Sequence, residues 1–252
     1  MPKTLLMIHG VGCGGDAWDA MKPGFEAAGW TCDAPTLFSQ LRTIETPPTA
    51  IKDLSLQDYI DASAGRCRQI ARETGEKPAV IGHSMGGKVA MKLAGLAQAQ
   101  VEKLLVLDMA PVAYGQRRHD NVFAGLKAVL EQKPTSRKQA LGILAQHIEM
   151  EGVRQFLGKS LYNNGEHLEW RFNVASLWDN YSQILGWNPI DKITTPTLMV
   201  KGGDSDYLTA EHQGEVQKQF ANVKAHVIAN TGHWLHAEKP QEVLRAIRKF
   251  IA

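Results

Sequence analysis

Hydrophobic residues fall in short runs along this chain, and longer stretches with helical periodicity separate the runs. The short runs predict six strands, at Thr4–Ile8, Thr31–Ala34, Pro78–Gly82, Lys103–Asp108, Thr197–Lys201 and Ala225–Ile228. The periodic stretches predict helices at Ala17–Ala28, Leu56–Glu73, Met85–Ala97, Ala210–Gln219 and Gln241–Ile251. This alternation is typical of an α/β fold, in which helices cover both faces of a mostly parallel sheet.

The alternation of strands and helices stops between Tyr114 and Asn188. Several helical patterns follow one another there, with breaks at Pro134, Gly152 and Asn163-Asn164-Gly165, and no convincing strand is present. We therefore expect a core formed by residues 1–113 and 189–252, and a helical cap formed by residues 114–188. The stretch Leu37–Lys52 has little periodicity and is expected to form a long loop.

Length and composition limit the classes of protein to consider. The chain has 252 residues, enough for one sizeable domain with an insertion, and its formal net charge of +2 gives no reason to expect nucleic acid as a partner. It has no apolar run of about 18 residues, so no membrane span is expected. Its three cysteines have no Cys-x-x-Cys spacing, which argues against a disulfide framework or a zinc ribbon. We expect a cytoplasmic monomer or homodimer without a metal.

The motif Gly82-His83-Ser84-Met85-Gly86 ends a predicted strand and begins a predicted helix. A Gly-x-Ser-x-Gly sequence in this context predicts a nucleophile elbow, in which a tight turn exposes the serine above the sheet. The backbone of the serine is strained in such a turn, so small residues are required two positions to either side, where Gly82 and Gly86 stand. Ser84 is therefore the candidate nucleophile.

A serine needs a histidine to take its proton, and the histidine needs a carboxylate to fix its tautomer. His233 follows the last predicted strand in Asn230-Thr231-Gly232-His233-Trp234 and is the candidate base. Two carboxylates compete for the third role: Asp206, in the loop after the penultimate strand, and Asp108, at the end of the strand before it. We rank Asp206 first, because the loop after the penultimate strand is the usual place for the acid, and keep Asp108 as the alternative.

Acyl transfer passes through a tetrahedral oxyanion, which backbone N–H groups can stabilise. The amide of Met85 directly follows the nucleophile and is one expected donor. The amide of Val11, after His9-Gly10 at the end of the first strand, is the expected second donor. The remaining candidates for contact with substrate are His9, Gly10, His83, Trp178 and Trp234.

These segments together resemble the α/β-hydrolase superfamily. Within it, the chain is similar to small bacterial esterases related to the mammalian ABHD-type acyl hydrolases, and the segments that carry the resemblance are His-Gly-x, Gly-His-Ser-Met-Gly-Gly, Asp-Met-Ala-Pro-Val and Gly-His-Trp-x-His-Ala-Glu-Lys-Pro. Some of these relatives use a carboxylate that matches Asp108 and lack one at Asp206, whereas this chain has both.

The resemblance implies a serine hydrolase that cleaves carboxylic esters of small or medium acyl chains through an acyl-enzyme intermediate. The same machinery serves thioesters, carbon–carbon bonds and perhydrolysis in this superfamily, so these reactions are the alternatives. The expected partner is a small-molecule ester, and no cofactor is implied.

A different class of protein has to be weighed against the hydrolase. Gly10-Val11-Gly12-Cys13-Gly14-Gly15 matches the Gly-x-Gly-x-x-Gly pattern of NAD-binding oxidoreductases, and Asp33 lies about 20 residues further on, as a ribose ligand would. If that interpretation held, the elbow at Ser84 and the loop histidine His233 would be coincidences. We therefore favour the hydrolase.

Overall fold

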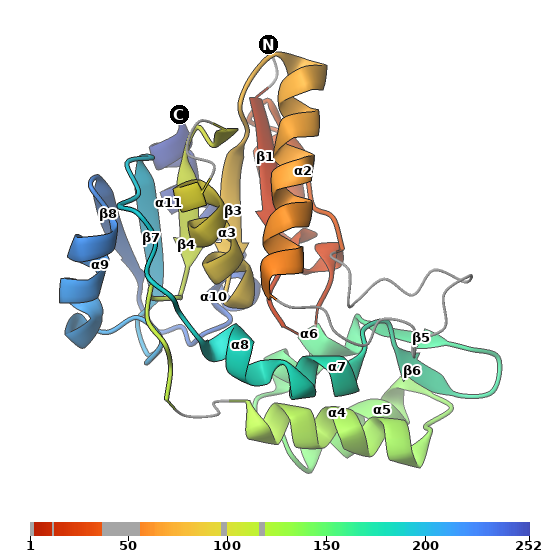
Figure 1. Ribbon diagram of the computed structural model, residues 1–252. Coiled ribbons are helices and arrows are strands. Elements are labelled where there is room, and N and C mark those ends of the chain that lie inside the picture. Colours follow the sequence, from red (N-terminus) through yellow and green to blue (C-terminus); the bar gives the residue numbers. More distant parts are fainter. Residues whose placement is uncertain (1–2, 12, 37–55, 97–99, 116–118) are drawn as a thin grey trace.

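The computed structural model describes residues 3–11, 13–36, 56–96, 100–115 and 119–252. Six strands form one parallel sheet in the order β2-β1-β3-β4-β7-β8 (Figure 1). Their bounds are β1 Lys3–Ile8, β2 Trp30–Asp33, β3 Ala79–His83, β4 Leu104–Leu107, β7 Thr197–Gly202 and β8 Val223–Ile228. All six predicted strands are present, so the predicted α/β class is confirmed.

Helices cover both faces of this sheet (Figure 1). The helices α2 (Leu56–Thr74) and α3 (Met85–Leu96) pack on one face, while α1 (Lys22–Glu26) and α11 (Pro240–Ile251) pack on the other. Every residue of β3 and β4 is buried between these layers, which explains why their sequences are continuous apolar runs. The helix α9 (Gln213–Gln219) precedes β8 in sequence, and α10 (Leu235–Glu238) follows it.

Two predicted helices are shorter than expected because a 3₁₀ turn occupies their first part. In place of Ala17–Ala28, the chain forms the 3₁₀ helix η1 (Gly15–Trp18) and then the short α1. Pro23 stands in the first turn of α1, where a residue without a backbone N–H is tolerated. In the interior of a longer helix the same proline would remove a backbone hydrogen bond, so a helix begins at this point and does not run through it. In place of Ala210–Gln219, the 3₁₀ helix η5 (Ala210–His212) precedes α9.

The chain leaves the sheet after β4 and returns at β7. The intervening segment forms the helices α4 Asp120–Gln132, α5 Arg137–Ala145, α6 Glu151–Gly158, α7 Val174–Asp179 and α8 Tyr181–Leu185. They lie as a layer beyond one end of the sheet, in green and cyan in Figure 1. We call residues 119–188 of this layer the cap.

The expectation that this segment has no strand is wrong. Within the cap, β5 (Leu161–Asn163) and β6 (Leu168–Trp170) form an antiparallel hairpin. The Asn163-Asn164-Gly165 sequence, which we interpreted as a break between helices, is its turn. Gly165 has a φ of +106°, which a glycine adopts without strain, and its N–H donates to the Asn163 side chain at 2.8 Å. Each strand has three residues, too few for a recognisable alternation.

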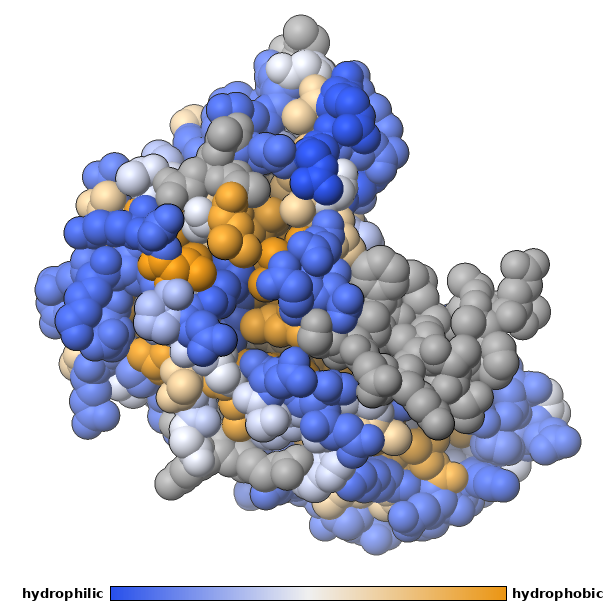
Figure 2. Space-filling model, in the orientation of Figure 1, coloured by the Kyte–Doolittle hydropathy of each residue, from blue (hydrophilic) through white to orange (hydrophobic). Residues whose placement is uncertain are grey.

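Hydrophobic residues gather on the face drawn in Figure 2, around α3 and between the hydrophilic surfaces of α2 and α9.

The cap meets the core at the carboxyl ends of β1, β3 and β4, because the chain enters α3 and the cap from those ends. Open parallel sheets place their functional residues at this edge. The candidate residues are therefore sought at the junction of core and cap.

Candidate active site

The turn between β3 and α3 holds Ser84 in a left-handed conformation, with a φ of +55°. A Cβ on Gly82 would lie 2.0 Å from the carbonyl oxygen of Gly86, and a Cβ on Gly86 would lie 2.3 Å from the carbonyl oxygen of Ile8. Neither position accepts a larger residue, which is the physical reason for the Gly-x-Ser-x-Gly spacing. The strained serine stands at the start of α3, where backbone N–H groups have no intrahelical acceptor. This is the geometry that the sequence predicts.

His233 lies between the serine and a carboxylate. Its Nε2 is 2.9 Å from Ser84 Oγ, and its Nδ1 is 2.8 Å from Asp108 Oδ2. Ser84 comes from the end of β3, Asp108 from the end of β4, and His233 from the loop after β8. Three segments far apart in the sequence thus form one continuous line of hydrogen bonds, which is the arrangement of a Ser-His-Asp triad.

The carboxylate in this line is Asp108, so the structure does not support our ranking of Asp206 before it. The loop after β7 alternates in burial: Ser205 and Tyr207 are buried, while Asp206 between them is exposed. The side chain of Asp206 therefore faces solvent at the position where we expected the acid. Asp108 has a φ of +50° directly after β4, and this left-handed turn brings its carboxylate to His233.

The carboxylate of Asp108 is fully buried and has three hydrogen-bond donors around it. Oδ1 accepts from the amide of Gly202 at 3.1 Å, and Oδ2 accepts from both the hydroxyl of Ser205 and His233. Burial raises the pKa of Asp108 to about 6, and the hydrogen bonds from Ser205 and Gly202 oppose that rise. These bonds also fix which oxygen faces the histidine. No pattern in the sequence singles out Ser205 beyond its place in the loop after a strand.

The rings of Tyr207 and His83 pack against the ring of His233. The ring of Tyr207 stacks on one face, with centroids 3.8 Å apart and planes 18° apart. The ring of His83 lies 4.8 Å away at a tilt of 41°, and its Nε2–H donates to the carbonyl oxygen of His233 at 2.8 Å. These contacts hold the loop that carries His233 and the plane of its imidazole. The sequence offered no reason to select Tyr207, because a single aromatic residue in a loop has no pattern.

His83 lies beneath the site and does not face a substrate, contrary to our expectation for it. It is 1% exposed and packs among His233, Trp234 and His236, the last with ring centroids 4.2 Å apart. Burial and the neighbouring His233 lower its pKa well below the usual value for histidine, so the ring is neutral. A neutral ring with its proton on Nε2 can make the bond to the His233 carbonyl.

The His9-Gly10-Val11 loop at the end of β1 approaches the nucleophile, as expected. A Cβ on Gly10 would lie 3.2 Å from the Cβ of Ser84, so the backbone of this loop packs directly on the serine. His9 is fully buried, its Nδ1–H donates to the Gly10 carbonyl at 2.9 Å, and burial lowers its pKa to about 4. His9 thus shapes the loop from within. The predicted donors, the amides of Val11 and Met85, lie on the two segments that border Ser84.

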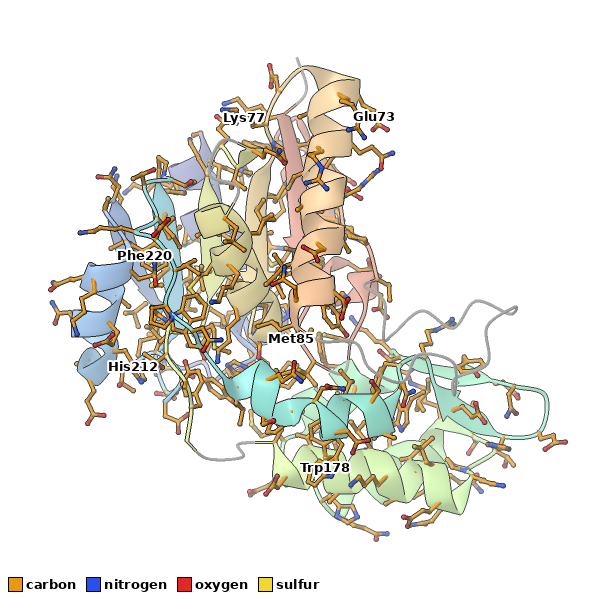
Figure 3. The ribbon with its side chains drawn as sticks, in the orientation of Figure 1. Glu73, Lys77, Met85, Trp178, His212 and Phe220 are labelled. Atoms are coloured by element: carbon orange, nitrogen blue, oxygen red, sulfur yellow. The ribbon has the colours of Figure 1, made fainter. Side chains whose placement is uncertain are left out.

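The two tryptophans named as substrate contacts lie in different surroundings. Trp234 follows His233 and packs against the rings of His83 and Phe156, so it borders the site. Trp178 lies inside the cap, where its ring meets Phe123 at 5.2 Å and the ammonium of Lys127 at 3.8 Å, both on α4. Figure 3 shows Trp178 on the α4 side of the cap, well apart from Met85. The structure does not bring Trp178 to Ser84.

Two contacts join the cap to the core beside the triad. His119, in front of α4, lies 2.6 Å from the hydroxyl of Tyr181 in α8 and within 3.4 Å of the hydroxyl of Tyr207. The ammonium of Lys88 in α3 is fully buried and donates to the carbonyl oxygens of Leu185 and Gly186, which end α8. Burial lowers the pKa of Lys88 to about 7. The cap therefore rests on α3, the helix that follows Ser84, and on Tyr207, which stacks on His233.

The carboxylate that a dinucleotide site would use has another partner. The carboxylate of Asp33 forms an ion pair with Arg66, at 2.5 Å between Oδ2 and Nε. Within the described ranges, no group of three metal-ligating side chains is found, and no helix is long and apolar enough to cross a membrane.

Comparisons with known proteins agree with this geometry. Residues 5–246 match the model of the alpha/beta hydrolase family. The chain belongs to the α/β hydrolase family. Over 176 residues it is 48% identical to the esterase YbfF of Escherichia coli, a match that covers 70% of this chain and 68% of the relative.

Two further relatives extend the comparison. The chain is 36% identical over 179 residues to the sn-1-specific diacylglycerol lipase ABHD11 of Mus musculus, covering 69% of this chain and 58% of that protein. Among solved structures, it is similar to a marine microorganism esterase with a TM-score of 0.85 and 26% identity, over 99% of this chain and 95% of the other. The chain is a carboxylic ester hydrolase of the α/β hydrolase family.

Proposed function

We propose that this α/β hydrolase cleaves carboxylic esters of small or medium acyl chains through an acyl-enzyme intermediate on Ser84. The observation that carries the proposal is the line of hydrogen bonds from Ser84 Oγ through His233 to Asp108. A serine hydroxyl gains nucleophilicity when a base stands within hydrogen-bond reach and a third group orients that base.

In the proposed first step, Ser84 Oγ attacks the ester carbonyl while its proton passes to His233 Nε2. Asp108 stabilises the imidazolium that forms, and the amides of Met85 and Val11 donate to the oxyanion, each worth about 3–4 kcal/mol in such sites. The C–O bond to the alcohol then breaks, and the alcohol leaves with the proton from His233. Water, deprotonated by His233, hydrolyses the acyl-serine in a second pass through the same groups.

The cap is proposed to act as a lid that limits the acyl chain. Two observations support this role. Ser84 is 5% exposed although its hydroxyl must meet the substrate. The cap contacts Lys88, in the helix after Ser84, and Tyr207, which stacks on His233. A cytoplasmic location and a monomeric or homodimeric state remain expectations for this chain.

The test is a panel of p-nitrophenyl esters of graded acyl length, with acyl-thioesters of the same acids beside them. We expect the rate to fall with long acyl chains, because the lid leaves little room over Ser84. A higher kcat/KM for the thioesters would assign the chain to the thioesterase alternative. Equal rates for all chain lengths would refute the lid.

A further inference from the structure

A pocket of about 350 Å³ opens between the core and the cap, and the mechanism does not use it. Cys13, Asp16 and Thr36 line it from the core. Lys159, Ser160 and Arg171 line it from the cap, at the end of α6 and after β6.

The pocket borders the active-site loop on the side of the His9-Gly10-Val11 segment. The backbone of Gly10 packs on Ser84, and the carbonyl oxygen of Gly10 accepts from the thiol of Cys13 at 3.2 Å. Cys13 is in turn a wall of the pocket. The pocket therefore adjoins the loop whose backbone packs on Ser84.

The charges and donors of the pocket favour an anion. Lys159 and Arg171 provide two cations against the single carboxylate of Asp16, and within the described part of the chain neither cation forms an ion pair. The guanidinium of Arg171 also lies over the ring of Tyr162, 5.5 Å from its centroid.

A hydroxyl on each side of the pocket adds a donor. Thr36 Oγ1 accepts from the amide of Gly15 at 3.0 Å, so the hydroxyl proton of Thr36 is left for another acceptor. Ser160, on the cap side, is a second hydroxyl lining the same space. A guanidinium, an ammonium and two hydroxyls are the groups that proteins use to hold a carboxylate or a phosphate.

We propose that this pocket binds an anionic group of the substrate, a carboxylate or a phosphate carried a few bonds from the ester. The inference rests on the proposed ester hydrolysis at Ser84 and narrows its substrate class to negatively charged esters. Asp16 weakens the attraction without cancelling it, because two cations face it.

The test compares matched pairs of substrates. Mono-p-nitrophenyl adipate carries a free carboxylate on its acyl chain, and methyl p-nitrophenyl adipate is its neutral counterpart with the same leaving group. A second pair, 3-acetoxypropyl phosphate and 3-methoxypropyl acetate, places the anion on the alcohol instead. We expect about a tenfold higher kcat/KM for the anionic member of one pair, mainly because its KM is lower. The pair that shows this preference identifies whether the acyl chain or the alcohol of the substrate carries the charge.

Variants of the pocket show whether it is the cause. Arg171→Gln combined with Lys159→Gln should abolish the preference and leave the neutral ester unaffected, whereas Asp16→Asn should increase it. Lys138→Gln, which removes a cation from α5 of the cap outside the pocket, is the matched control and should change nothing. No preference in either pair, or one that survives the double substitution, overturns the proposal.

A failure of the proposed function would give a different result, since no ester of either pair would then be hydrolysed. In that case the pocket is tested by adding glutarate or inorganic phosphate and measuring the melting temperature. A rise in the wild type that the Arg171→Gln, Lys159→Gln variant lacks supports the anion site. Equal rises, or none, overturn it.

Discussion

Replacing Asp108 by asparagine should nearly abolish turnover, whereas the same change at Asp206 should leave it nearly intact. The structure gives the reason. Oδ1 of Asp108 accepts from the amide of Gly202 at 3.1 Å, so the oxygen of an asparagine would keep that place and its NH₂ group would face His233 Nδ1. The NH₂ group would donate to Nδ1 and favour the tautomer with the proton on Nε2. That tautomer cannot accept the proton of Ser84.

The expected loss is about 10⁴ in kcat, which corresponds to roughly 5.5 kcal/mol of transition-state stabilisation. Asp206 is exposed and lies outside the line of hydrogen bonds. Asp206→Asn should therefore keep more than about a third of the wild-type rate, because substitutions at the surface usually have small effects. The assay is hydrolysis of p-nitrophenyl acetate at pH 8, with circular dichroism to verify folding. An Asp108→Asn variant within tenfold of the wild type, or a large loss for Asp206→Asn, would refute the assignment of the acid.

Three further predictions concern the surroundings of the triad. Turnover should fall as the pH drops through about 6, because Asp108 becomes protonated there. The hydrogen bond from Ser205 lowers the pKa of Asp108, so Ser205→Ala should move this acidic limb of the pH–rate profile to higher pH. An unchanged limb in the variant contradicts this prediction. His83→Phe removes the hydrogen bond to the His233 carbonyl and should lower kcat roughly tenfold with KM unchanged. His83→Gln keeps an N–H near that carbonyl and should restore part of the rate. Equal losses in both variants would argue that this hydrogen bond does not position His233. Burial lowers the pKa of Lys88 in the folded chain to about 7. Above that pH the unfolded chain therefore binds more protons than the folded chain, and the free energy of unfolding should rise from pH 7 toward pH 10. Lys88→Met should flatten this rise in urea titrations, and an identical slope in both proteins would exclude Lys88 as its source.

Much of the core could be predicted because each part has a local cause. The central strands β3 and β4 are buried on both faces, so they appear as apolar runs. The elbow needs Gly82 and Gly86 for steric reasons that any sequence must satisfy. Ser84 and His233 followed from the chain order of such sites. These features depend on a few neighbouring residues, which the sequence displays directly.

The parts that escaped prediction depend on how loops turn. Both carboxylates, Asp108 and Asp206, follow strands that end at the same edge, and the choice between them rests on two details. One is the left-handed turn of Asp108, and the other is the alternating burial around Asp206. The hairpin at Leu161–Trp170 has strands of three residues, too short for a periodic signal. The stack of Tyr207 on His233 is a contact between separate loops, which no local pattern encodes.

The central claim is that Ser84 is the nucleophile and that His233, oriented by Asp108, activates it. The most direct test is labelling with a fluorophosphonate probe followed by peptide mapping, in the wild type, in Ser84→Ala and in Asp108→Asn. The account predicts a single phosphonylated peptide that contains Ser84, no label in Ser84→Ala, and greatly slowed labelling in Asp108→Asn. A label on another residue, or equal labelling of Ser84→Ala, would contradict it.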